Sequence, residues 1–254
     1  LREPYESLVS RVQSFGRYMF DLRDYPTAAR LFDNPRFVDL ARRVCPAHKQ
    51  HLDPFQFNFI VQLPGQTVAA HVDGVYFWGA TRFQFPQWLL AVMIFSNRFR
   101  ADFVDQVQVV AYLHEWETAS RRKAGEFIHW ASAENASATP RSAAAGSDAH
   151  IAAKPSVFKA AARAGSAIDG SKSVHAAEVY LGSDASPPLP FLDKNKKLIL
   201  RYDGPGDDKA WSLNEDGRLL ERYSTDDLRT SIVYRARCFM DADEAARFGG
   251  NGGP

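Results

Sequence analysis

Residues 57–73 read FNFIVQLPGQTVAAHVD, a segment in which a turn separates two apolar runs and a histidine and an aspartate follow. The apolar run at its start predicts a strand over residues 55–61, followed by a turn at Pro64-Gly65. Residues 68–72 predict a second strand, which leads into His71-Val72-Asp73. Because strand residues two apart point to one face, an imidazole and a carboxylate would project together from a rigid element.

The pattern continues as many short apolar runs with turn signals between them. Val107–Leu113 predicts a strong strand, and Glu126–Trp130 is its expected partner. Further strands are expected at Ser156–Ala162, Val174–Tyr180, Leu198–Tyr202, Arg218–Tyr223 and Thr230–Phe239. Since the helices come mainly before these strands, the sequence predicts an antiparallel β-sandwich or open barrel backed by N-terminal helices.

Helical spacing appears in three places. A helix over residues 5–20 is predicted by the apolar positions Leu8, Val12, Phe15 and Met19. Pro35 is expected to open a second helix that Pro46 ends, and both helices are expected to pack against the sheet. The uncharged run Trp88–Phe95 predicts a buried helix after Pro86.

Composition and charge exclude several classes of protein. The chain has 254 residues, 45% of them hydrophobic, which allows a large core in one domain. Its 31 basic and 30 acidic residues give a net charge of +1, so no field of one sign favours nucleic acid or an anionic membrane. The apolar run Trp88–Phe95 is too short to span a bilayer.

Two cysteines, Cys45 and Cys238, are too few for a disulfide framework or a zinc site. No N-terminal charged-then-apolar signal is present and the ends look trimmed, so the compartment stays open.

One segment has a different composition. Ala131–Ala153 is rich in small and polar residues and cannot bury enough apolar surface to stay ordered on its own. Strand-like segments resume after it, so we interpret residues 131–153 as a flexible loop within a single domain that spans residues 1–254. Residues 1–50 are expected to supply helical support and residues 55–240 the β core.

His71 and Asp73 supply two of the three ligands of a 2-His-1-carboxylate triad, which holds Fe(II) and leaves positions open for co-substrate and oxygen. The chain has seven histidines. His48 and His51 lie in a polar connection, and His150 lies in the small-residue segment, where a ligand is hard to fix. The remaining candidates for the third ligand are His114, His129 and His175.

Six short motifs follow one another in a recognisable order. They are Gln62-Leu63-Pro64-Gly65, His71-Val72-Asp73, Val110-Ala111-Tyr112-Leu113, Ala124-Gly125-Glu126-Phe127, Val174-His175-Ala176-Ala177-Glu178-Val179 and Leu228-Arg229-Thr230-Ser231-Ile232-Val233-Tyr234. In this order they resemble the 2-oxoglutarate- and Fe(II)-dependent dioxygenases, in particular the prolyl-4-hydroxylase-like branch. The resemblance covers residues 55–240. It implies a mainly β fold with flanking N-terminal α-helices and a double-stranded β-helix (jelly-roll, cupin-like) core.

The same resemblance implies a site and a reaction. His71, Asp73 and His175 would bind the iron as metal ligands, and the far carboxylate of 2-oxoglutarate would pair with Arg229. Ser231 shares the strand face of Arg229 and adds a hydroxyl donor, while Gln62 stands where relatives place a tyrosine that touches the co-substrate. The implied enzyme is an oxidoreductase, a hydroxylase that uses O2 on a C–H bond and converts 2-oxoglutarate to succinate and CO2, with ascorbate as a stimulant.

Several points stay open. Because 54 positions separate His175 from Arg229, residues 182–227 would have to be an insertion, and Arg201 is a rival for the co-substrate carboxylate. An alternative interpretation of Arg229 is a solvent-exposed arginine on an edge strand without a binding role, because Arg235 and Arg237 follow at the same alternation. The aromatic residues after the metal pair are expected either to wall a substrate pocket or to pack in the core; they are Tyr76, Phe77 and Trp78.

The substrate is expected to be a prolyl or other peptidyl residue, or an amino-acid-like small molecule. Two hypotheses from other classes remain. One is a binding module on the same fold with an idle metal site. The other is a metal-dependent hydrolase that uses His71 and Asp73 with His114 or His129.

Overall fold

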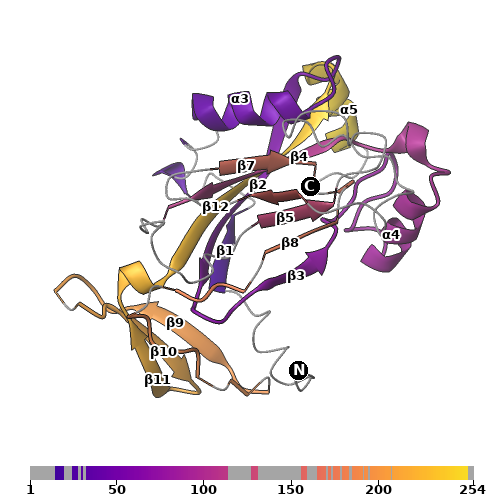
Figure 1. Ribbon diagram of the computed structural model, residues 1–254. Helices are drawn as coiled ribbons and strands as arrows, with labels where there is room; N and C mark the ends of the chain where they lie inside the picture. The colour runs from indigo at the N-terminus through magenta and orange to yellow at the C-terminus, as the bar shows by residue number, and fades with distance from the viewer. Residues whose placement is uncertain are drawn as a thin grey trace.

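The computed structural model in Figure 1 is mainly β, with three α-helices and three antiparallel sheets in the part of the chain that it describes. The described residues are 15–19, 25–27, 30, 33–113, 127–130, 156–158, 165–169, 171–172, 174–177, 179–182, 185–190, 192–193, 195–206 and 208–250. No helix among them is long and apolar enough to cross a membrane.

The largest sheet has five strands in the order β1-β2-β12-β4-β7. Their bounds are β1 Phe15–Met19, β2 His51–Gln62, β12 Arg229–Phe239, β4 Gln106–Tyr112 and β7 Gly165–Ile168. β12 is the long central strand and pairs along its length with β2 and β4. Its even-numbered residues from Tyr234 to Cys238 pack into one core cluster, while its odd-numbered residues face the opposite side.

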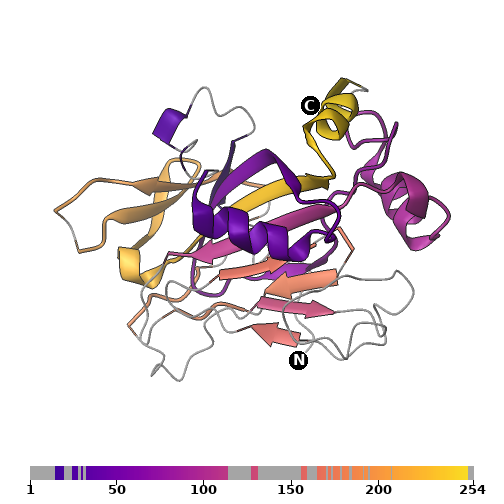
Figure 2. The same ribbon diagram turned by 90° about the horizontal axis from the view of Figure 1, so that it is seen from above.

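Helix α3, Pro35–Val44, covers the outer face of this sheet (Figure 2). Asn34 caps it by accepting a hydrogen bond from the Arg36 N–H, and Pro35 occupies the first turn, where no N–H partner is needed. The Phe37 ring stacks on Tyr234 at a centroid distance of 5.8 Å. The predicted helix between Pro35 and Pro46 is therefore confirmed, together with its packing on the sheet.

A disulfide joins Cys45, directly after α3, to Cys238 on β12. The two cysteines lie 193 positions apart, and both are buried in the cluster between α3 and the sheet. The bond fastens the helix to the central strand. This bond was not predicted from the sequence.

The second sheet has four strands in the order β3-β8-β5-β6. Their bounds are β3 Val68–His71, β8 Val174–Ala177, β5 Phe127–Trp130 and β6 Ser156–Phe158. Side chains of this sheet and of the five-stranded sheet line one common cavity, so the two sheets face each other (Figures 1 and 2). The predicted pairing of Glu126–Trp130 with the strand at 107–113 is wrong. β5 pairs instead with β8 and β6, while β4 is flanked by β12 and β7.

The third sheet, ordered β11-β10-β9, projects from one end of the molecule (Figure 1). Its strands are β9 Leu198–Tyr202, β10 Trp211–Glu215 and β11 Arg218–Tyr223. Leu213 and Tyr223 are fully buried in a cluster with Val61, near the end of β2, and with Leu63, directly after that strand. Apolar contacts therefore attach this sheet to the end of the larger one. The short turn η4, Thr225–Asp227, then leads directly into β12.

Two helix predictions need correction. Residues 15–19 form strand β1, which pairs with β2, while residues 5–14 lie outside the described residues. The apolar spacing at Phe15 and Met19 also suits a strand beside a sheet edge, and tertiary pairing decides between the two. The helix after Pro86 exists as α4, Gln87–Phe95, but only Leu90 in it is buried. The remaining helices are η2 Arg100–Asp102 and α5 Ala242–Gly250. The segment 131–153 lies outside the described residues.

Candidate metal centre

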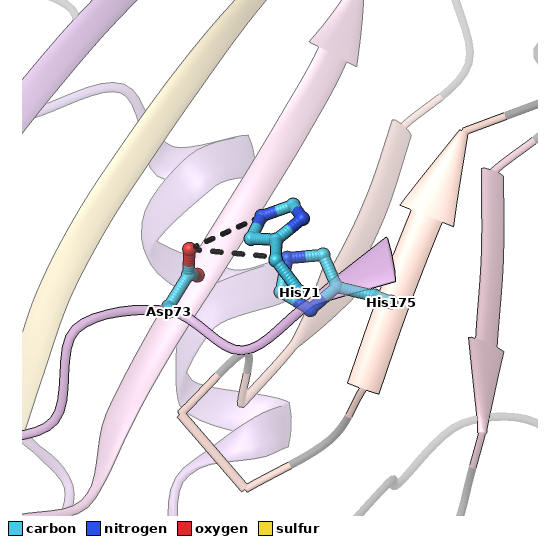
Figure 3. A group of neighbouring side chains, drawn as sticks. All are labelled: His71, Asp73 and His175. Atoms are coloured by element: carbon cyan, nitrogen blue, oxygen red, sulfur yellow. Dashed lines mark ion pairs between the residues drawn. The ribbon is translucent and has the colours of Figure 1, made fainter. Parts of the chain in front are cut away.

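His71, Asp73 and His175 come together between the two facing sheets (Figure 3). His71 ends β3, Asp73 follows two positions later, and the strand register sets His175 on β8 opposite His71. One potential ligand atom from each residue lies within 4.8 Å of the others. Asp73 Oδ1 is 3.7 Å from His71 Nε2 and 3.8 Å from His175 Nε2. Residues about a hundred positions apart thus present two nitrogens and an oxygen to one point.

The donor set fits a divalent metal ion. His71 Nδ1 lies 2.7 Å from the Ala69 carbonyl oxygen, so this nitrogen donates its proton to the backbone and leaves Nε2 available as a ligand. Asp73 Oδ2 is buried and has no hydrogen-bond partner among the described residues. The other oxygen, Oδ1, lies near both imidazole nitrogens, and a cation there would help to offset the cost of burying the carboxylate. Two imidazoles and one carboxylate also suit iron chemically.

Charge around Asp73 keeps this carboxyl ionised. Burial by itself would raise its pKa, but Arg235 and the imidazoles of His175 and His71 outweigh that effect and lower the pKa below its usual range. Arg235 Nη2 lies 3.8 Å from Asp73 Oδ2. The guanidinium is held by the Gln106 side-chain oxygen at 3.2 Å, so it faces the carboxylate from a fixed position. Sequence reasoning did not propose Arg235 as part of the site.

The cluster opens into a cavity of about 340 Å³ between the sheets. Alternate residues of the central strands face it, as the two-residue period of a strand requires. From β12 these are Arg229, Ser231, Val233 and Arg235, and from β2 they are Gln56, Asn58, Ile60 and Gln62. β4 adds Gln108, Val110 and Tyr112. The cavity therefore has an apolar middle between polar groups at either end of β12.

Arg229 is the most informative residue in this cavity apart from the metal cluster. It is only 4% exposed and stands opposite Gln62 in the strand register. Its Nη1 donates to Gln62 Oε1, and its guanidinium carbon lies 4.8 Å from the centre of the Tyr112 ring. It forms no ion pair with any described carboxylate, and its Nε has no hydrogen-bond partner among the described residues.

Burial lowers the pKa of the Arg229 guanidinium, an effect that Tyr112 and Tyr180 partly oppose. A buried guanidinium that has no acidic partner in the described part of the chain is suited to bind an anion, because a carboxylate would balance its charge and accept from its N–H groups. The interpretation of Arg229 as a solvated edge-strand arginine is therefore wrong. β12 is central, and Arg237 farther along it is also buried, with its Nη2 2.8 Å from Asp53.

Other predicted residues lie elsewhere. Arg201 is on β9, its side chain is 70% exposed, and it pairs with Asp203 at 2.6 Å without lining the cavity. His114 and His150 are outside the described residues. β5 sets His129 opposite His175 in register, but its side chain is outside the described part of the structure. His48 and His51 do not line the cavity.

The aromatic residues after the metal pair belong to the core. Tyr76 and Phe77 are each 1% exposed and pack in separate clusters, Tyr76 with Phe55 and Phe77 with Phe103. Trp78 packs against the Tyr76 cluster. None of the three lines the cavity, so the structure supports their interpretation as core residues and not as walls of a substrate pocket.

No protein-family model matches the chain, and no curated protein matches it in sequence. Among solved structures, the chain is similar to a prolyl-4-hydroxylase from Pseudomonas putida at 15% identity and a TM-score of 0.33, over 88% of this chain and 71% of that one. It is similar to HygX from Streptomyces hygroscopicus, solved with nickel, 2-oxoglutarate and hygromycin B, at 10% identity and a TM-score of 0.39, over 92% and 76% of the chains. A 2OG-Fe(II) oxygenase family oxidoreductase from Burkholderia pseudomallei has 12% identity and a TM-score of 0.35, over 91% and 76%. Similarity at these values assigns neither an activity nor a substrate.

Proposed function

We propose that the chain is an Fe(II)- and 2-oxoglutarate-dependent dioxygenase that hydroxylates a C–H bond. One observation carries the proposal: the His71-Asp73-His175 cluster shares a single cavity with the buried Arg229, which has no acidic partner among the residues that the structure describes. A metal-ligand set alone would suit many functions. A metal-ligand set with an anion site a short way along the same cavity suits a co-substrate that is itself a dicarboxylate.

We further propose that the core is a double-stranded β-helix. Two facing antiparallel sheets of five and four strands, with the metal cluster between them, support this interpretation. β3 and β8 of the smaller sheet bring the two imidazoles together, and β2, β12 and β4 of the larger sheet supply the inner wall. Residues 182–227, which contain the third sheet, would then be an insertion before the last core strand.

In the proposed site His71, Asp73 and His175 would hold Fe(II). The Arg229 fork, the Ser231 hydroxyl and the Gln62 amide would hold the far carboxylate of 2-oxoglutarate. The apolar side chains of Ile60, Val110 and Val233 line the part of the cavity between these two groups and would exclude water from it. Arg235 keeps Asp73 ionised and oriented. When bound, iron, 2-oxoglutarate and O2 supply the oxidising chemistry, with decarboxylation of 2-oxoglutarate to succinate and CO2. Of possible substrates, we propose a prolyl or other peptidyl residue or an amino-acid-like small molecule.

Two measurements test this function. Anaerobic calorimetric titration with Mn(II), used in place of Fe(II), should show one site in the wild type and none in Asp73→Ala. Arg201→Ala, which changes an exposed arginine, is the matched control and should bind metal normally. Succinate formation from 2-oxoglutarate in the presence of Fe(II) and O2 should then depend on the same residues. Metal binding without succinate would favour the idle binding module, and hydrolysis without O2 would favour a metal-dependent hydrolase.

A further inference from the structure

The exposed large apolar side chains of the described residues are unevenly distributed. Six of the twelve fall between positions 83 and 99. They are Phe83 at 57% exposed, Phe85 at 40%, Trp88 at 68%, Val92 at 55%, Phe95 at 46% and Phe99 at 40%. Single exposed apolar residues are ordinary on protein surfaces, but six within 17 positions of the sequence, five of them aromatic, indicate a contact surface. We call these six residues the apolar patch.

Helix α4 gives the patch its shape. Its nine residues, QWLLAVMIF, contain no charged residue. Trp88, Val92 and Phe95 follow one another at intervals of four and three, so they form one stripe along the helix. Leu90 points the other way and is fully buried against a cluster that includes Phe77. Figure 1 shows α4 at the side of the molecule, and its first residue, Gln87, lines the cavity between the sheets.

The charges near the patch are mainly positive, although the exposed Asp102 follows Arg100 by two positions in η2. Between Asp73 and Asp102 the sequence contains no Asp or Glu, whereas it contains Arg82, Arg98 and Arg100. Arg98 and Arg100 are exposed, directly beside Phe99. The near-neutral charge of the whole chain therefore hides a local surface that is aromatic and basic.

We propose that the apolar patch docks on the surface of a bilayer that contains anionic lipid. Protruding aromatic side chains need no complementary groove there, because the headgroup region is fluid. Indole and phenyl rings favour that region, and each arginine near an anionic surface adds attraction. A second copy of the chain would have to offer a matching groove and carboxylates opposite the arginines. The proposal is independent of the proposed dioxygenase activity.

Co-sedimentation of the full chain with vesicles tests the proposal. Vesicles of phosphatidylcholine mixed with phosphatidylglycerol should carry the protein down, and phosphatidylcholine alone should do so much more weakly. Trp88→Ala and Phe95→Ala should each weaken binding about tenfold, equivalent to roughly 1.4 kcal/mol. Arg98→Gln and Arg100→Gln should each weaken it about fivefold, whereas Arg98→Lys should retain it.

The matched control changes exposed apolar residues elsewhere. Ile199→Ala and Leu219→Ala, on the third sheet, should leave vesicle binding unchanged. Unchanged binding in Trp88→Ala and Phe95→Ala would overturn the proposal, and so would equal binding to both vesicle types. A concentration-dependent dimer in sedimentation velocity, dissociated by Trp88→Ala and without vesicle binding, would overturn it in favour of a second copy. Thermal melting of each variant checks that the fold is intact.

Discussion

Replacing Arg229 with methionine should separate folding stability from ligand binding. The guanidinium is 4% exposed and forms no ion pair with a described carboxylate, so the ligand-free protein carries a buried charge that little compensates. Methionine has a similar length and no charge. The variant loses the hydrogen bond to Gln62 and the contact with the Tyr112 ring, but it also loses the desolvation cost.

The two effects can be weighed. The lost hydrogen bond and ring contact contribute about 1–3 kcal/mol together. The desolvation of a buried ion costs several kcal/mol. We therefore expect Arg229→Met to leave the free energy of unfolding unchanged or to raise it by about 1–2 kcal/mol, a rise in Tm of up to about 8 °C. In contrast, affinity for 2-oxoglutarate should fall by about 2–5 kcal/mol, which is roughly thirtyfold or more.

Arg237 provides the control for stability. It lies on the same strand with 3% exposure, but its partner is Asp53 and its guanidinium packs over the rings of Phe55 and Phe248. Arg237→Met should therefore destabilise the protein by about 2–4 kcal/mol, less than for a fully buried pair because Asp53 is partly exposed. Thermal melting without ligand, and calorimetric titration of the Mn(II)-loaded protein with 2-oxoglutarate, measure the two quantities. A decrease in Tm in Arg229→Met equal to that in Arg237→Met, with unchanged 2-oxoglutarate affinity, would contradict this prediction.

Three further predictions concern the metal, the buried ions and the disulfide. His175→Ala should lower Mn(II) affinity by roughly a hundredfold or more, and normal titration would show that another residue completes the triad. Asp105→Asn should cost about 1–3 kcal/mol in urea unfolding at about pH 7, because Asp105 pairs with the largely buried Lys172. Despite burial, the lysines lower the pKa of Asp105 and the carboxylates raise the pKa of Lys172, so this contribution should persist between roughly pH 4 and pH 10. It should fade below that window as Asp105 gains a proton, and above it as Lys172 loses one. Cys45→Ser should lower the free energy of unfolding by about 2–4 kcal/mol, since the bond to Cys238 closes a long loop; an unchanged urea midpoint would contradict this.

The strands around the cavity were predictable because their signal is local. The two-residue alternation along β12 predicts from the sequence alone that Arg229, Ser231 and Val233 share a face. All three line the cavity in the structure. The proline that opens α3 is an equally local signal. Asp73 follows His71 by two residues, so their common direction needed no knowledge of the rest of the fold.

Other features depend on contacts that a single sequence does not contain. The register that sets His71 opposite His175 comes from the pairing of β3 with β8. The apolar composition of α4 predicts a buried helix. How much of that helix is actually buried depends on which other elements pack against it, and only Leu90 is buried in the structure. The strands β7 and β10 are short, and their residues GSAI and WSLNE carry too weak a pattern to stand out. The role of Arg235 could not be predicted either. Alternating arginines in a strand indicate a solvent-exposed face, and only the structure shows that a carboxylate lies beside Arg235.

The position of β12 limits how the chain can change. Eleven residues of one strand carry Arg229 at the beginning and Arg235 beside Asp73, with both side chains on the same face. An insertion or deletion of a single residue between them would turn one arginine away from the cavity while the other stayed. No such coupling acts on the turn between β10 and β11, which faces solvent at Asp216 and Gly217. Variation in length is therefore expected to collect in the third sheet, and attempts to graft new segments into this protein should begin there.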